Sequence, residues 1–392
     1  MADLEVASLR DLLIERRGDM VSLLMELANL ESPSLVPESQ STVQELLTRR
    51  FEAIGFSAQL FPGEKTGSHL FLSAEEEGSP AESKPVQLLL GHTDTVWPIG
   101  TLREMPVEWD QKEDVVRGPG VFDMKGGIVQ MVFALEALSE LGLQPSVAPT
   151  IFLNSDEEIG SPESQGHVER LAKASSRVLV LEPALGDEGL IKTTRRGVWR
   201  FEIKVVGRAS HSGVALEEGA SAIQEMSVVI QTLHGLTDPE RGIAVNVGTV
   251  SGGTGVNVVA AECRASVDVR VATLADGQWI NEVIRGLKAT TPGTRVEVEV
   301  VLDRGPMEAT PRNRRLWEAV QDCGRRLGLE LEGTLSGGAS DGNTTSLFTA
   351  TIDGLGAVGD GAHASHEHVR VDGFPERTAL LALILMMPAL EG

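Results

Sequence analysis

The sequence contains no tyrosine and only two cysteines in 392 residues. The absence of tyrosine excludes a mechanism in which a tyrosine hydroxyl acts as general acid or oxyanion donor. Cys263 and Cys323 lie far apart in the sequence, so neither a disulfide framework nor a thiolate metal cluster is expected. Two isolated cysteines fit a reducing compartment, and we predict a cytoplasmic protein.

Basic residues are also scarce: lysine and arginine total 34 against 57 aspartates and glutamates, for a formal net charge of −23. Such a chain repels the phosphates of nucleic acids and anionic lipids, so we expect neither as a partner. An anionic small-molecule substrate is still compatible with this charge, because metal ions and arginines can reverse the field inside a cleft.

Long apolar runs are missing as well. No run approaches the roughly 20 residues of a membrane-spanning helix, and residues 1–17 contain no apolar signal segment. The length instead has room for two domains of about 150 residues each.

The first part of the chain carries short apolar runs separated by a helical pattern. Leucines at helical spacing over residues 4–30 predict an amphipathic helix that is interrupted near Arg17 to Asp19. Between residues 85 and 185, "VQLLL", "TIFLN" and "VLVLE" predict buried strands, with a helix between the first two. We therefore expect an α/β catalytic domain with a mostly parallel sheet and helices on both faces.

Residues 198–303 follow a different pattern. "VWRFEIKVV" and "AECRASVDVRV" alternate between apolar and polar residues, which is typical of strands with one face in water. The order strand, helix, strand, strand, helix, strand predicts a split βαβ, ferredoxin-like α+β domain. We place this lid and dimerisation domain at residues 197–303, inserted into a catalytic domain formed by residues 1–196 and 304–392.

Acidic residues and a histidine follow the predicted strands of the first domain: His92, Asp94, Asp123, Glu157, Glu158 and Glu182. Strand carboxyl ends meet at the ligand-binding edge of an open α/β sheet, so we expect these side chains to converge. Converging carboxylates repel one another unless a cation lies among them. Imidazole and carboxylate ligands without thiol suit zinc, with manganese or cobalt as substitutes.

The pattern His92-x-Asp94 fits a metal ligand followed by the residue that orients it, because a ligating imidazole needs an acceptor on its other nitrogen. On its own this pattern is also typical of a capped turn, and Glu157 and Glu158 could simply face solvent. The joint occurrence of these residues favours the metal site.

Seven motifs occur in order along nearly the whole chain: "GHTDTV", "RGPGVFDMKGG", "NSDEEIGS", "LEPA", "GRASHSG", "GGASDGN" and "GAHASHEHV". Together they resemble the dizinc metallopeptidase and deacylase family that includes bacterial glutamate carboxypeptidase, aminoacylase and acetylornithine deacetylase. The resemblance implies two zinc ions bridged by Asp123, with His92 and Glu182 completing one site and Glu158 and His363 the other. It implies Glu157 as general base.

The resemblance also assigns residues around the substrate. It implies that His211 stabilises the oxyanion from the partner subunit of a homodimer. It also implies that Asn257 and Arg304 bind the substrate carboxylate. At Asn257 this sequence reads "NVV", whereas the family pattern is Asn-x-Ile-Pro. Arg270 either assists them or faces solvent, and Ser340 and Asp341 line the pocket without a catalytic role. If His363 is not a metal ligand, His366 is the alternative. His368 is expected at the surface or in the substrate pocket. The remaining histidines, expected on loops or helix surfaces, are His69, His167 and His234.

We therefore expect a metal-dependent hydrolase that cleaves an amide bond next to a free α-carboxylate in a peptide or N-acyl amino acid, most like glutamate carboxypeptidase. An N-acyl amino acid deacylase or deacetylase is the first alternative, since it uses the same metals and base. A metal-stabilised binding protein without catalysis is the second, and the presence of Glu157 argues against it, because a structural metal site needs no unligated carboxylate.

Overall fold

The computed structural model describes residues 3–74 and 85–390 and divides the chain into two compact units. Unit 1 consists of Met1–Thr194, Ala309–Ser336 and Ser340–Gly392, and unit 2 of Arg195–Glu308 and Gly337–Ala339. Unit 2 thus interrupts unit 1 in the sequence. Its ends lie at residues 195 and 308, and the predicted bounds were 197 and 303.

Unit 1 is built on a six-stranded sheet. Its strands, in spatial order, are β1 (Ser57–Phe61), β2 (His69–Ser73), β6 (Ala148–Asn154), β3 (Val86–His92), β7 (Ser175–Val180) and β14 (Ala350–Ile352). Strands β6, β3, β7 and β14 are parallel, and β2 runs antiparallel to both of its neighbours. The expectation of a mostly parallel sheet is confirmed.

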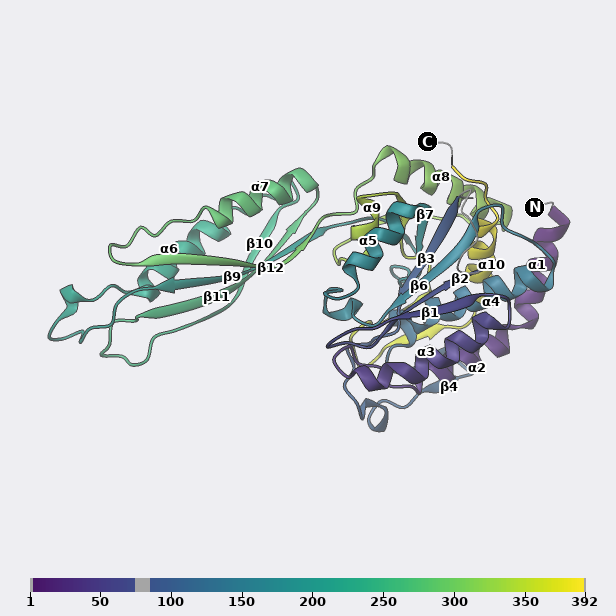
Figure 1. Ribbon diagram of the computed structural model, residues 1–392, viewed down its shortest axis with the longest axis horizontal. Helices are drawn as coiled ribbons and strands as arrows, with labels where there is room; N and C mark the ends of the chain where they lie inside the picture. Colours follow the sequence, from purple (N-terminus) through teal and green to yellow (C-terminus); the bar gives the residue numbers. More distant parts are fainter. Residues whose placement is uncertain (1–2, 75–84, 391–392) are drawn as a thin grey trace. The chain divides into compact units, whose positions relative to one another are not determined.

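Helices cover both faces of this sheet because its central strands are apolar on both sides (Figure 1). In β3, Leu89 packs into the larger core, whereas Leu88 and Leu90 pack into a smaller one. The larger core takes side chains from α1 (Asp3–Glu15), α2 (Arg17–Ala28), α3 (Pro37–Glu52), α4 (Gly126–Glu140), α8 (Pro311–Arg326) and α10 (Phe374–Leu385). The smaller core takes Val168 and Ala172 from α5 (Gln165–Ala174), and α9 (Asp341–Ser346) contacts α5.

Two polar side chains in the sheet fix the end of the chain against it. The amide of Gln87 donates to the carbonyl of Leu385, at 2.8 Å. The buried guanidinium of Arg177 donates to the carbonyls of Met387 and Pro388, at 2.8 and 2.7 Å. Helix α10 also contacts α1 and α4, so the last helix completes the core that the first helices begin.

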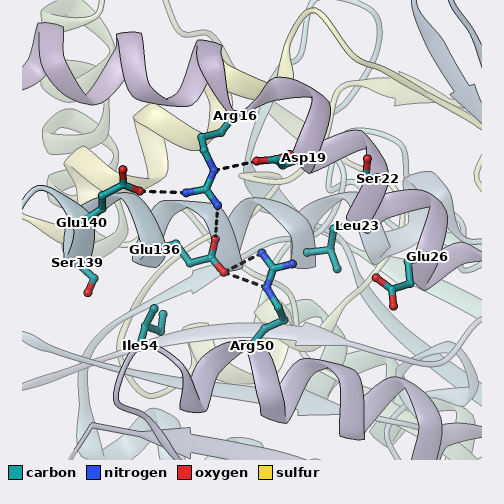
Figure 2. Close-up of a pocket in the computed structure, with 10 residues that line it drawn as sticks. All are labelled: Arg16, Asp19, Ser22, Leu23, Glu26, Arg50, Ile54, Glu136, Ser139 and Glu140. Atoms are coloured by element: carbon teal, nitrogen blue, oxygen red, sulfur yellow. Dashed lines mark hydrogen bonds and ion pairs between the residues drawn. The ribbon is translucent and has the colours of Figure 1, made fainter.

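A groove on unit 1 is lined by α2, α3 and α4 (Figure 2). Arg16 donates to Asp19, Glu136 and Glu140, and Arg50 donates to Glu136 at 2.8 Å. Each basic group in this groove therefore already has an acidic partner, and the groove has no converging set of groups that would bind a ligand.

Smaller sheets complete unit 1. The strands β15 (Gly359–Asp360), β16 (His368–Arg370), β5 (Val115–Arg117) and β4 (Glu108–Asp110) form an antiparallel sheet, and β13 (Gly333–Ser336) pairs with β8 (Ile191–Arg195). Single turns of 3-10 helix lie at Thr101–Arg103 and Glu157–Ile159. The pairing of β5 with β16 brings the segment before Asp123 next to the segment after His363.

Unit 2 has the predicted split βαβ order: β9 (Gly197–Val206), α6 (Ala222–His234), β10 (Ala244–Gly252), β11 (Glu262–Val271), α7 (Leu274–Arg285) and β12 (Arg295–Arg304), with a short 3-10 turn at Leu216–Glu218. The sheet is antiparallel, in the order β10-β11-β9-β12. Trp199, Phe201, Ile203 and Val205 pack with residues of both helices. No helix in the described part of either unit is long and apolar enough to cross a membrane.

Candidate metal centre

The candidate ligands lie at one edge of the unit 1 sheet because three adjacent strands are parallel. His92 is the last residue of β3 and pairs with Asn154, the last residue of β6. Glu157 and Glu158 follow β6, and Glu182 follows β7. The carboxyl ends of β6, β3 and β7 therefore bring these four side chains to the same edge, where open α/β sheets bind ligands.

Asp123 lies between two imidazoles. Its Oδ1 is 3.3 Å from Nε2 of His92, and its Oδ2 is 3.4 Å from Nε2 of His363. His92 Nε2 is also 3.3 Å from Oε1 of Glu182, and His363 Nε2 is 3.0 Å from Oε2 of Glu158. Each oxygen of one carboxylate thus faces a separate group of one histidine and one glutamate.

Asp94 orients His92 in two ways. The Nδ1 atom of His92 lies 3.0 Å from the backbone carbonyl of Asp94 and 3.4 Å from its Oδ1. The buried Asp94 carboxylate also accepts the Ser34 hydroxyl at 2.6 Å and the backbone N–H groups of Glu157 and Glu158 at 3.2 and 3.1 Å. One aspartate therefore aims the imidazole and holds the turn that carries both glutamates.

The buried atoms of this cluster fit a bound cation. His92 Nε2, Asp123 Oδ1 and Glu158 Oε1 are buried and make no hydrogen bond of normal geometry within the described residues. Ligand atoms of His92, Asp123 and Glu158 lie within 4.8 Å of one another, and so do those of His92, Glu157 and Glu182. Unpaired buried polar atoms are costly, and a divalent ion would satisfy them. Nitrogen and oxygen ligands of this kind suit zinc.

The raised pKa values of three residues in the cluster also fit a bound cation. Burial opposes the charged form of His92, but the carboxylates of Asp123, Asp94 and Glu182 outweigh it and raise its pKa well above the usual value. Contacts with Asp123 and Glu158 raise the pKa of His363 to about 10. Burial raises the pKa of Glu158 to about 7. Without metal, protons on His92, His363 and Glu158 offset the negative charge of the surrounding carboxylates.

Glu157 and Glu158 lie in a 3-10 turn, Glu157–Ile159. They therefore do not lie on opposite faces of an extended strand. Successive side chains in a 3-10 turn point about 120° apart, which separates them in another way. Glu158 faces His363, whereas Glu157 groups with His92 and Glu182.

The glycines of "RGPGVFD" shape the loop that carries Asp123. Gly118 and Gly120 have φ values of +151° and +72°, which side-chain-bearing residues rarely adopt. A Cβ on Gly120 would also lie 2.6 Å from Cγ2 of Thr95. The loop passes from β5 to α4 and delivers Asp123 to the edge of the sheet.

Among the histidines of the tail, His363 reaches the cluster. Nε2 of His366 lies 3.9 Å from Asp360, and Nδ1 of His368 lies 3.1 Å from the carbonyl of His366. Within the described residues, neither of these two contacts the candidate ligands, so the geometry gives the alternative ligand His366 no support. Two residues near the cluster were not singled out from the sequence. Lys192 has its Nζ 4.0 Å from Oε2 of Glu182, and Glu367 binds the backbone of the Asp123 loop.

Ser340 and Asp341 are buried, with exposed fractions of 1% and 3%. The Ser340 hydroxyl accepts from the Gly342 N–H and donates to Asp353 at 2.6 Å. Asp341 accepts from Asn154 at 2.6 Å and from Ser161 at 2.5 Å. These side chains, expected to line a pocket, are thus held in a network beneath the ends of β6 and α9.

The surface prediction for His69 is wrong. His69 is 1% exposed, because β2 is an interior strand of the sheet. Its Nδ1 accepts the backbone N–H of Ser155 at 3.3 Å, and its ring lies 6.1 Å from that of Phe152. Burial lowers the pKa of His69, which favours the neutral ring.

The candidate residues of unit 2 form two groups. His211 and Asn257 lie together: the Ser212 N–H donates to the Asn257 carbonyl at 3.0 Å, and His211 bridges to Val258. Arg270 and Arg304 flank the same residue of β9, Val198. His211 follows the other end of β9, and the strand from Val198 to Val206 spans about 26 Å at about 3.3 Å per residue. The two groups therefore lie toward opposite ends of this strand.

Arg270 is already paired. It donates to both oxygens of Asp268, at 2.8 and 3.1 Å, so a substrate carboxylate would compete with this bidentate pair. Arg304 is 7% exposed at the end of β12.

Comparison with known proteins agrees with this fold and cluster. The family model for peptidase family M20/M25/M40 matches residues 88–387, and the chain belongs to this family. Carboxypeptidase G2 of Pseudomonas sp. (strain RS-16) is 29% identical over 308 residues, 76% of this chain and 73% of that protein. A succinyl-diaminopimelate desuccinylase of Gluconacetobacter diazotrophicus is 27% identical over 379 residues, 91% of this chain and 94% of that protein.

Among solved structures, the YXEP protein of Bacillus subtilis, a dinuclear metal-binding peptidase of the M20 family, superposes with a TM-score of 0.68 at 14% identity, covering 94% of this chain and 97% of that one. The fold is thus that of the M20 structures. Family membership makes this protein a metallohydrolase that acts on peptide or N-acyl amino acid bonds.

Proposed function

We propose that this protein hydrolyses an amide bond next to a free α-carboxylate, as a carboxypeptidase-like member of its family. The observation that carries the proposal is the Asp123 carboxylate between two imidazoles, with Glu157 grouped beside His92 and Glu182. Similarity to carboxypeptidase G2 supports the carboxypeptidase assignment.

In this proposal two zinc ions, which cobalt or manganese could replace, would be held by His92, Asp123, Glu182, Glu158 and His363. When bound, they would lower the pKa of a water molecule and polarise the scissile carbonyl. Glu157 takes a proton from the attacking water and passes it to the leaving amine. Asp94 keeps His92 and the Glu157–Glu158 turn in place through the hydrogen bonds described above.

The proposed oxyanion donor is His211. Its Nδ1 accepts the Gly213 N–H at 3.1 Å, which leaves the proton on Nε2, the atom that would donate to the developing oxyanion. His211 and Asn257 lie at one end of the unit 2 sheet, and Arg270 and Arg304 at the other. This separation supports a homodimer in which one protomer supplies His211 and Asn257 and its partner supplies the arginines for the substrate carboxylate.

An N-acyl amino acid deacylase is the second candidate, and the desuccinylase relative, aligned over 91% of this chain, favours it. Both reactions use the same cluster and differ in the group on the acyl side. Matched substrates that share one amino acid and carry either a peptidyl or a succinyl group would separate them through kcat/KM. A cytoplasmic location is also part of the proposal, with the two free, buried cysteines as its support.

The test of the mechanism is Glu157→Gln, which keeps the shape of the side chain and removes its basicity. We expect kcat to fall by about 10²–10⁴-fold, the usual contribution of a general base, with bound zinc unchanged. The matched control is Glu169→Gln on α5, a partly exposed glutamate paired with Lys173, which should keep full activity. A Glu157→Gln enzyme with wild-type kcat would contradict the proposed role.

A further inference from the structure

Glu367 is a fully buried carboxylate that receives four hydrogen bonds from one loop region and one indole. Its Oε1 accepts the backbone N–H groups of Phe122 and Asp123, at 3.0 and 3.1 Å. Its Oε2 accepts the backbone N–H of Gly120 at 2.9 Å and the indole N–H of Trp97 at 2.8 Å. The exposed fraction of Glu367 is 0%.

Glu367 also belongs to the segment that carries His363. Its backbone N–H donates to the carbonyl of Ala364 at 3.0 Å, which closes the turn after His363, and its carbonyl accepts the N–H of Gly118 at 3.3 Å. A Cβ on Gly361 would lie 2.8 Å from the backbone of Glu367, so the turn is packed tightly on this residue. Glu367 therefore joins the loop of Asp123 to the turn of His363 through its side chain and its backbone.

The four N–H donors around the Glu367 side chain all require a hydrogen-bond acceptor, so a group that carries a hydrogen of its own cannot satisfy all of them. An ionised carboxylate offers about four lone pairs, and four donors converge on it here. A glutamine would direct an NH2 group at backbone N–H groups, leaving donors unsatisfied. Because Asp123 and His363 face each other across 3.4 Å, a shift of either segment would change the spacing of the candidate ligands.

We propose that Glu367 is a positioning residue that sets the spacing of Asp123 and His363 for metal binding. This inference rests on the ligand set of the proposed function, and it adds a residue that contacts no ligand atom of that set directly. Residues that orient metal ligands typically contribute 10- to 100-fold to metal affinity, about the effect expected here.

The test is a titration of the metal-free full-length protein with Co²⁺, followed by its visible absorption spectrum, which reports the coordination of the bound ion. Glu367→Gln should weaken Co²⁺ binding by about 10- to 100-fold and alter the absorption bands. The matched control is Glu225→Gln in unit 2. Glu225 is also 0% exposed and accepts the backbone N–H groups of Thr290 and Thr291, at 3.0 and 2.6 Å. This control should lower the urea midpoint of the metal-free protein but leave Co²⁺ affinity and spectrum unchanged.

Co²⁺ affinity within twofold of wild type in Glu367→Gln, with an unchanged spectrum, would overturn the proposal and leave Glu367 as a packing residue like Glu225. If Glu367→Gln does not fold, Trp97→Phe decides, because it removes one donor and keeps the three backbone contacts. It should weaken Co²⁺ binding in the same direction by a smaller factor, and an unchanged isotherm would count against the proposal. Failure of the proposed function differs in outcome. If the ligand set is wrong, wild-type protein binds no Co²⁺ at this cluster, and if only the reaction is wrong, wild-type protein binds Co²⁺ but hydrolyses no amide substrate.

Discussion

The polar groups of the two units are arranged in opposite ways. On the water-facing side of the unit 2 sheet, acids and bases pair, as in Lys204 with Glu262 at 3.0 Å and Arg270 with Asp268 at 2.8 Å. At the edge of the unit 1 sheet, carboxylates gather around two histidines, and buried atoms of His92, Asp123 and Glu158 have no hydrogen-bond partner among residues 3–74 and 85–390. The charges on this face of unit 2 are thus paired within the protein, whereas the cluster at the edge of the unit 1 sheet has an excess of carboxylates that a bound cation would balance.

The largest effect that would test this contrast is expected at Asp123. Asp123→Asn removes the charge that both histidines share, so bound metal should fall and kcat/KM should drop by about 10³-fold or more, the equivalent of several kcal/mol of transition-state stabilisation. Metal analysis and steady-state kinetics would measure both. The control is Asp110→Asn, an aspartate of unit 1 that caps Lys112 and Glu113 away from the cluster. Full metal content in Asp123→Asn would contradict the shared-ligand assignment.

A second effect is expected in the pH dependence of the metal-free protein. The pKa of His363 is raised from 6.5 to about 10, and that of Glu158 from 4.5 to about 7. Both values are above those of the unfolded chain, so each group adds stability at low pH that is lost as the pH rises through its folded pKa. The free energy of unfolding should therefore decrease from about pH 4.5 to about pH 10.

The metal-bound protein should behave differently over the same window. Metal ligands must lose their protons to bind, so metal affinity, and with it the stabilisation by bound metal, should increase with pH. Urea unfolding across this window, with zinc and with chelator, would measure the two slopes. If the free energy of unfolding changed with pH by the same sign and size with zinc and with chelator, protonation of His363 and Glu158 would not control metal binding at the cluster.

The smallest effect is expected from the charges of unit 2. Lys204→Ala removes a partly exposed pair with Glu262, and exposed pairs contribute at most about 1 kcal/mol. Urea unfolding should detect little change, and zinc affinity should equal that of wild type. A loss of about 3–5 kcal/mol, typical of breaking a buried ion pair, would show that the two units differ less than their charge pattern indicates.

Much of the fold could be predicted from periodicity, because buried and half-buried strands have different patterns. Continuous apolar runs identified β3, β6 and β7, and strict alternation identified β9 and β11. Parallel neighbours then place the strand ends together, which is why His92, Glu158 and Glu182 could be expected at one edge. Asp123 was also expected at a strand end, but it lies in the segment between β5 and α4. The place of His363 was implied by the resemblance of its motif rather than by periodicity.

Features that depend on tertiary contacts were beyond the sequence pattern. The burial of His69 depends on β1 and β6 lying on either side of β2, and nothing in "HLFLS" indicates an interior strand. Glu367 lies in a tail rich in histidine, and its importance depends on the pairing of β5 with β16. The local signal is an acidic residue between His366 and His368, two positions before Val369.

The position of α10 has a consequence for biosynthesis. Phe374–Leu385 is translated after the whole of unit 2, yet it contacts α1 and α4 and covers apolar residues of the larger core. On the ribosome, unit 2 is therefore complete while the earlier-made part of unit 1 still lacks its closing helix. A nascent chain that stalls before this helix emerges would carry an open apolar surface, which is the kind of species that aggregates.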